Sequence, residues 1–263
     1  MSTLVVRGRP ETIQDDRAIG RLLLDRTAET GEPSVRVWRP HRQLAVGPRD
    51  TRAEGFDRAA SIASELGYPV VERSVGGRAV AYTGRTLAFA RTIPIDDVRS
   101  GMTARYEAAT ELLLSALRST GAAVTEGEPP GSYCPGTHSV QISSGDIEGD
   151  RREPADTYGK VAGLAQRVTG DAAIVSGILT VARADEPELA SVLEPVYEAL
   201  DVPFDPASIG SVAAAGGPDD PSDVSQAIET ALVAGSEEEG SGHGRSTDVE
   251  PTIVGARALL ADR

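Results

Sequence analysis

Residues 158–167 read Tyr-Gly-Lys-Val-Ala-Gly-Leu-Ala-Gln-Arg. The alternation of small and apolar side chains from Lys160 to Gln166 predicts a short strand. Lys160 is the only lysine of a chain of 263 residues whose other basic side chains are all arginines. A lysine beside Ala and Gly is partly removed from water and still reaches a carboxylate, phosphate or thioester oxygen. We interpret Lys160 as a pocket cation; the alternative is a surface lysine left by chance.

The composition is strongly acidic. The chain has 40 Asp and Glu against 26 Lys and Arg, a formal net charge of −14. Such a surface repels phosphate backbones, so we expect no nucleic-acid partner. Abundant carboxylates with almost no lysine resemble the composition of proteins from salt-loving microbes, because carboxylates hold water and cations at high salt. We therefore attribute the acidity to a halophilic habitat, which also explains much of the lysine loss.

The only cysteine, Cys134, lies in the loop segment Ser-Tyr-Cys-Pro-Gly at 132–136. It cannot form an internal disulfide, which fits a reducing cytosol. A nearby ammonium such as Lys160 would make its thiol a nucleophile; a buried, inert cysteine is the alternative. The N-terminus has no signal-peptide layout, and no apolar run approaches the roughly 18 residues of a membrane helix. We expect a cytoplasmic protein with no membrane partner.

Hydrophobic periodicity and turn residues predict helices followed by strands and helices again. The expected helices are 14–29, 56–66, 102–119, 187–200 and 222–234. The expected strands are 34–38, 44–47, 69–73, one or two within 79–92, 139–143, 160–166 and 174–181. Residues 126–135 are expected to form a loop, and 145–157 a charged hairpin insertion. This order favours an α+β or mixed α/β layer fold over residues 1–234. Residues 235–263 are predicted to be an acidic low-complexity linker and a short C-terminal segment.

A glycine pair follows the strand predicted at 69–73. Arg73 precedes the run Gly76-Gly77-Arg78-Ala79-Val80. Two glycines allow positive φ and let a ligand reach bare backbone amides, although an ordinary tight turn is the simpler interpretation. The spacing excludes a P-loop. The three histidines, His41, His138 and His243, show no zinc spacing, so no metal site is predicted.

The order of these motifs resembles the lipoate–protein ligase and octanoyltransferase family. The segments that resemble it are 36–47, 71–80, 87–90 and 160–167, and the resemblance extends from about residue 10 to about residue 200. It implies a central mixed sheet flanked by helices, a fold shared with biotin ligases. It also implies that Lys160 lies in a pocket for a medium-chain acyl group. The other implied pocket residues are Arg73, Gly76, Gly77, Arg78, Ala79, Gly163 and Ala165.

Within that family, Gly-Gly-Arg in the first motif is typical of octanoyltransferases with a catalytic cysteine. The resemblance implies that Cys134 attacks an octanoyl thioester on acyl carrier protein, and that Lys160 stabilises the thiolate and the oxyanion with help from amides near Gly77. The acceptor would be a lysine of a lipoyl domain, in a 2-oxoacid dehydrogenase acyltransferase subunit or the glycine cleavage H protein. This reaction needs no cofactor.

Two departures from the family pattern leave other functions open. The family has histidines where this chain has 81–84 (Ala-Tyr-Thr-Gly) and 175–177 (Val-Ser-Gly). One alternative is an ATP-dependent lipoate–protein ligase that uses ATP, Mg²⁺ and free lipoate or octanoate, with a separate accessory subunit. The other is a degenerate member that binds acylated or lipoylated domains without catalysis. Only the ligase would release pyrophosphate, and only the transferase would depend on Cys134.

Overall fold

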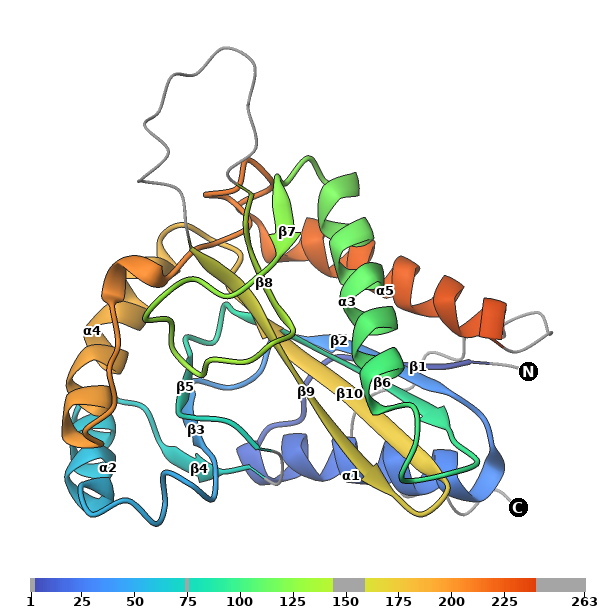
Figure 1. Ribbon diagram of the computed structural model, residues 1–263, viewed down its shortest axis with the longest axis horizontal. Helices are drawn as coiled ribbons and strands as arrows, with labels where there is room; N and C mark the ends of the chain where they lie inside the picture. The colour runs from blue at the N-terminus through green and yellow to red at the C-terminus, as the bar shows by residue number, and fades with distance from the viewer. Residues whose placement is uncertain (1–2, 74–75, 144–158, 240–263) are drawn as a thin grey trace.

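A mixed seven-stranded sheet forms the centre of the computed structural model, which describes residues 3–73, 76–143 and 159–239 (Figure 1). β1 and β2 run parallel, and every other neighbouring pair is antiparallel. The predicted mixed α/β architecture is confirmed. In spatial order the strands are β1 (Leu4–Arg7), β2 (Ser34–Trp38), β6 (Leu87–Pro94), β10 (Ala172–Leu179), β9 (Lys160–Thr169), β8 (Ser139–Ile142) and β7 (Val124–Glu126).

A second sheet of three strands accompanies the large one. It has the order β4 (Val70–Glu72), β3 (Gln43–Val46) and β5 (Val80–Tyr82). β3 runs parallel to β4 and antiparallel to β5. The predicted strands at 44–47 and 69–73 therefore belong to a small sheet of their own. The turn that carries the glycine pair leaves β4 and enters β5.

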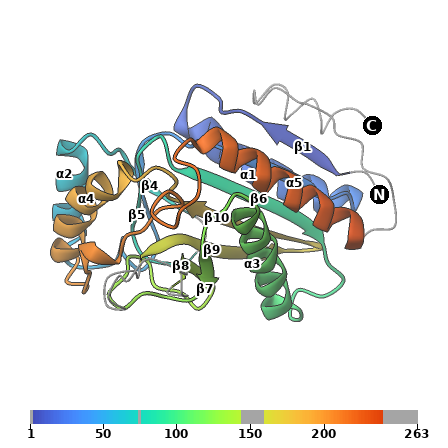
Figure 2. The same cartoon turned by 90° about the horizontal axis from the view of Figure 1, so that it is seen from above.

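Helices cover both faces of the large sheet. α1 (Ile13–Thr30) packs on one face, and α3 (Met102–Ser119) and α5 (Pro221–Glu239) pack together on the other (Figures 1 and 2). The alternation of side chains along the strands explains this arrangement, since β2 sends Val35 and Val37 into the core under α3 and α5 and Arg36 toward α1. α2 (Phe56–Glu65) and α4 (Asp185–Ala199) pair beside the small sheet, and a short 3₁₀ helix, η1 (Pro206–Ser208), follows α4.

Two large hydrophobic cores correspond to these two parts, and a third, small cluster joins β1 to α1. The larger core lies between the seven-stranded sheet and the helices α3 and α5, with Phe89, Leu117 and Ile228 buried in it. The other lies between the small sheet and the helices α2 and α4, and it includes Tyr133 and Tyr197. Tyr133 lies in the loop between β7 and β8, so this loop is attached to the second core. The loop that carries Cys134 is therefore held against the second core.

The small residues of β9 and β10 have a steric reason. Gly177 of β10 pairs with Leu164 of β9 and Phe89 of β6. A Cβ at Gly177 would lie 2.5 Å from Cε1 of Phe89 and 2.9 Å from the carbonyl oxygen of Gly163. Glycine at this position leaves the space that the Phe89 ring occupies.

The predicted helices and strands are confirmed within a few residues, with four differences. The two edge strands of the large sheet, β1 and β7, and the 3₁₀ helix η1 were not predicted. The helix predicted at 222–234 continues to Glu239, inside the segment predicted as low-complexity linker. Buried contacts extend it: Ser236 accepts a hydrogen bond from the Nε of Arg91 and donates one to the carbonyl of Leu232. The predicted insertion at 145–157 and the C-terminal segment after 239 lie outside the described residues.

None of the helices in the described ranges combines the length and apolar character that crossing a membrane would require.

Candidate functional site

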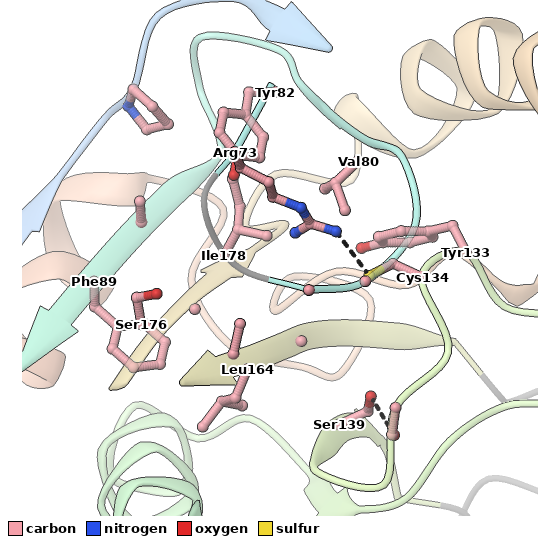
Figure 3. A pocket seen from close by; sticks show the side chains of 18 of the residues that line it. Arg73, Val80, Tyr82, Phe89, Tyr133, Cys134, Ser139, Leu164, Ser176 and Ile178 are labelled. Atoms are coloured by element: carbon pink, nitrogen blue, oxygen red, sulfur yellow. Dashed lines mark hydrogen bonds between the residues drawn. The ribbon is translucent and has the colours of Figure 1, made fainter. Parts of the chain in front are cut away.

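A cavity of about 440 Å³ lies between the small sheet, the α1-facing side of the large sheet and the loop from β7 to β8 (Figure 3). Seven of the nine predicted site residues line it: Cys134, Lys160, Arg73, Gly76, Gly77, Gly163 and Ala165. Arg78 and Ala79 lie just outside. The Arg78 guanidinium bonds the buried carboxylate of Asp50 at 2.9 Å, and the carbonyl of Ala79 accepts the Tyr197 hydroxyl at 2.9 Å. Both residues therefore hold the glycine turn in place and do not line the cavity.

The backbone of Cys134 is held in a conformation that few side-chain-bearing residues adopt. Its φ is 43°, in the left-handed region. Its N–H donates to the hydroxyl oxygen of Tyr197 at 2.6 Å, and its carbonyl accepts from Nζ of Lys160 at 2.7 Å. Sparsely populated backbone conformations persist only where the surroundings impose them, and they cluster at functional sites. Both peptide groups of Cys134 are fixed by residues far away in the sequence.

The Lys160 side chain is buried, with 1% of its surface exposed, at the start of β9. Its ammonium donates to the carbonyls of Cys134 and Tyr133, at 2.7 and 3.0 Å, and to Oε1 of Glu128 at 3.2 Å. Burial lowers the pKa of Lys160 below its usual value, against the opposing effect of the Glu128 carboxylate. Three acceptors use the three protons of the ammonium. Lys160 thus contacts the backbone of Cys134, and the structure assigns it no bond to the sulfur.

Glu128 connects Lys160 to the rest of the loop. Its carboxylate accepts hydrogen bonds from the hydroxyls of Ser132 and Ser139 and from the N–H of Gly136, the last at 3.1 Å. Because hydrogen bonds to a charged group are stronger than neutral ones, this carboxylate fixes the loop on both sides of Cys134.

The cation that reaches the sulfur is Arg73. Its Nη2 donates to Sγ of Cys134 at 3.3 Å (Figure 3), and to the carbonyl of Arg78 across the glycine turn. Burial lowers the pKa of Arg73, but the neighbouring Cys134 and Tyr82 outweigh burial and raise it above its usual value. Arg73 is therefore a permanent positive charge at the sulfur.

Gly77 leaves the space in which this contact forms. Its φ is +107°, a conformation open to glycine. A Cβ at this position would lie 2.6 Å from Nη2 of Arg73 and 2.7 Å from Sγ of Cys134. Glycine is thus required at position 77 by the close approach to the thiol as well as by the positive φ, whereas a Cβ at Gly76 would meet nothing within 4 Å.

The rest of the cavity is mostly apolar. Val80, Leu164 and Ile178 point into it, with Phe89 at its side (Figure 3). Tyr82 and Ser176, which occupy the two stretches where the resembled family has histidines, also line it. A mostly apolar cavity of this size, with one thiol and the cations Arg73 and Lys160 at one end, suits an apolar chain ending in a reactive carbonyl.

Two supporting residues were missed by sequence reasoning, Glu128 and Tyr197. Glu128 lies among prolines and glycines, and Tyr197 lies on α4, 63 positions from Cys134. Neither shows a sequence signal, because their role depends on contacts made only in the folded chain. Among the residues with assigned positions, no group of three or more His, Cys, Asp or Glu side chains could hold a metal ion.

Comparison with known proteins gives a consistent answer. The sequence profile of the lipoyl protein ligase A/B catalytic domain matches residues 14–215. An octanoyl-GcvH:protein N-octanoyltransferase from Geobacillus kaustophilus is 35% identical over 108 residues, which are 41% of this chain and 38% of that protein. The match thus spans less than half the length of this relative.

Solved structures share the fold. Lipoate-protein ligase A bound with ATP superposes with a TM-score of 0.65 at 19% identity, covering 100% of this chain and 94% of that one. A bipartite lipoate protein ligase from Thermoplasma acidophilum, described with its E2 lipoyl domain, gives a TM-score of 0.65 at 16% identity, covering 100% and 92%. These likenesses establish the architecture.

Proposed function

Because this chain belongs to the lipoyl protein ligase A/B catalytic domain family, we propose that it transfers an octanoyl or lipoyl group to a lysine of a lipoyl-domain protein through a thioester on Cys134. The observation that carries the proposal is the position of Cys134 Sγ, 3.3 Å from a permanent cation and at the lining of an apolar cavity. Reactive cysteines typically lie beside cationic side chains in partly exposed sites, which is the arrangement of Cys134 and Arg73.

The reaction has two steps. The Cys134 thiolate attacks the carbonyl carbon of the donor acyl group, a carbon–sulfur bond forms, and the donor leaves as a thiol or an amine with one proton. The amine of the acceptor lysine then attacks the thioester carbonyl. A carbon–nitrogen bond forms, the amine loses a proton, and the Cys134 thiolate is released. No oxidant, metal or nucleotide is consumed.

The donor and acceptor are protein-bound groups. The name of the Geobacillus relative gives octanoyl-GcvH as donor and a protein nitrogen as acceptor. We propose the same class of donor here, the glycine cleavage H protein or acyl carrier protein, and an E2-type lipoyl domain as acceptor. A cytoplasmic location and adaptation to high salt stay predictions from composition.

Two alternatives differ in what they require of the site. An ATP-dependent ligase would need the glycine turn to receive phosphate oxygens, with ATP and Mg²⁺ bound nearby. The space against Gly77 is taken by the guanidinium of Arg73 and the sulfur of Cys134, which favours thiol chemistry at this turn. A non-catalytic binder would use the same cavity without a covalent step.

The deciding experiment measures the mass of a lipoyl domain after incubation at high salt with octanoyl-H protein or octanoyl-carrier protein. We expect the mass of one octanoyl group to appear on the domain without ATP. Cys134→Ser should abolish this transfer and the acylated form of the protein. Ser64→Ala, on the exposed face of α2, is the matched control and should leave transfer unchanged.

The other outcomes separate the alternatives. Modification that needs ATP and free lipoate and survives Cys134→Ser would identify a ligase. Affinity for the lipoyl domain without any modification would identify a binder. Either result overturns the covalent mechanism.

A further inference from the structure

We propose that Arg73 is the catalytic cation of this site, which stabilises the Cys134 thiolate, and that Lys160 is a positioning residue that fixes the backbone of Cys134. The sequence resemblance assigns the first role to Lys160. The inference rests on the proposed role of Cys134 as nucleophile, but it concerns a different property, namely which of two buried cations acts on the sulfur.

The two cations direct their hydrogen bonds to different atoms of Cys134. Nη2 of Arg73 lies 3.3 Å from Sγ, whereas Nζ of Lys160 is bonded to the carbonyl of the same cysteine at 2.7 Å. The attraction between opposite charges falls with distance and is strongest for the group in contact. The cation in contact with the sulfur is the guanidinium.

The two cations also differ in the number of N–H protons that they carry. The ammonium of Lys160 has three, and the carbonyls of Tyr133 and Cys134 and the carboxylate of Glu128 accept them. A guanidinium has five N–H protons, and the two on Nη2 of Arg73 are donated to Sγ and to the carbonyl of Arg78. The Nε of Arg73 is buried and makes no hydrogen bond within the described part of the chain. Arg73 therefore has more donors than its two contacts use, whereas all three protons of Lys160 are accepted.

Different neighbours surround the two cations and support their separate roles. Gly77 has no side chain at the point where a Cβ would separate Arg73 from the sulfur. Lys160 acts instead with Glu128 and Tyr197, and these three hold the loop and the left-handed φ of Cys134. The contacts of Arg73 and Gly77 are with the sulfur of Cys134, and those of Lys160, Glu128 and Tyr197 fix its main chain and the loop around it.

The test is the pH dependence of Cys134 alkylation by iodoacetamide, a neutral reagent, followed by intact mass at constant salt. Because the chain has one cysteine, each added mass reports this thiol alone. Loss of a cation in contact with a thiolate typically lowers its population by about tenfold or more at neutral pH. We expect Arg73→Gln to slow alkylation at pH 7 by about tenfold and to move the midpoint of the profile to higher pH.

Three variants complete the test. Arg73→Lys, which keeps the charge on a shorter side chain, should give a midpoint between those of the parent and Arg73→Gln. Lys160→Met should move the midpoint less than Arg73→Gln does, while it lowers the rate of acyl transfer. Arg58→Gln, on the exposed side of α2, should change neither quantity.

The proposal is overturned if Arg73→Gln leaves the midpoint in place, or if Lys160→Met moves it as far or further. Thermal unfolding of each variant identifies one that fails to fold. If Arg73→Gln fails to fold, the alkylation midpoints of Arg73→Lys and the parent are compared, and equal midpoints overturn the proposal. Alkylation does not require acyl transfer, so the two proposals fail in different ways. If the proposed function is wrong, the parent protein shows no acyl transfer, although its alkylation still depends on Arg73.

Discussion

The two halves of the site are built differently. Lys160, Gly163 and Ala165 lie on β9, a ten-residue strand inside the large sheet, where ladder hydrogen bonds fix each position. Cys134 and Gly77 lie in irregular segments, both with positive φ. The strand keeps its shape through its own pairing, whereas the loop keeps its shape through Lys160, Glu128 and Tyr197. The reactive group is thus on the half of the site that depends on others for its geometry.

This difference indicates where the site is most sensitive. A change on the strand is resisted by its neighbours on both sides, β8 and β10. A change at the turn or the loop alters the distance between Arg73 and the sulfur directly. Substitutions of equal size should therefore have unequal effects in the two kinds of structure.

The largest effect is expected from Gly77→Ala. The new methyl group would lie within 2.7 Å of both Arg73 Nη2 and Cys134 Sγ, on a backbone with φ +107°. Reacting groups displaced by about 1 Å can lose about a hundredfold in rate, and we expect a loss of acyl transfer of that order. The measurement is kcat for octanoyl transfer.

Gly20→Ala is the matched control, because nothing lies within 4 Å of the position of its Cβ on α1. It should keep full activity and gain up to about 1 kcal/mol of stability from better helix propensity. Equal activities of the two variants would contradict the steric role of Gly77.

A smaller effect is expected from Tyr197→Phe. The change removes the partner of two peptide groups, the N–H of Cys134 and the carbonyl of Ala79, inside a core where Tyr197 is 1% exposed. Buried groups left without partners cost about 1–3 kcal/mol. Urea unfolding should show this loss, and kcat should fall because Cys134 is less well fixed.

Tyr68→Phe separates stability from function. Tyr68 lies in the same core, is as buried as Tyr197, and donates a hydrogen bond from its hydroxyl to the Glu188 carboxylate at 2.7 Å. It should lose a comparable amount of stability with no change in kcat. A fall in kcat of the same size in both variants would mean that Tyr197 acts only through stability.

The same contrast explains what the sequence could predict. Regular elements such as 34–38 and 102–119 were predicted with their observed bounds, because local periodicity specifies them. The positions of Cys134, Lys160 and the glycine turn in one cavity agree with the family resemblance. The bond from Lys160 to a carbonyl instead of the sulfur could not be predicted, since it depends on how the loop around Glu128 closes. No local pattern encodes a contact between residues 26 or 63 positions apart.

The smallest effect is expected from the ionisation of Lys160. Burial lowers the pKa of this ammonium in the folded chain below its value near 10.5 in the unfolded chain. Between the two values the unfolded chain holds a proton that the folded chain has released, so stability rises with pH in that window. The parent should therefore gain stability relative to Lys160→Met as pH rises through the lowered pKa toward 10.5. Urea unfolding of both proteins at pH 7 and at pH 10 measures this difference. The stability difference between the two proteins could instead stay constant or fall with pH. That result would mean that Glu128 and the two carbonyls compensate fully for burial, so that the pKa of Lys160 is not lowered in the folded chain.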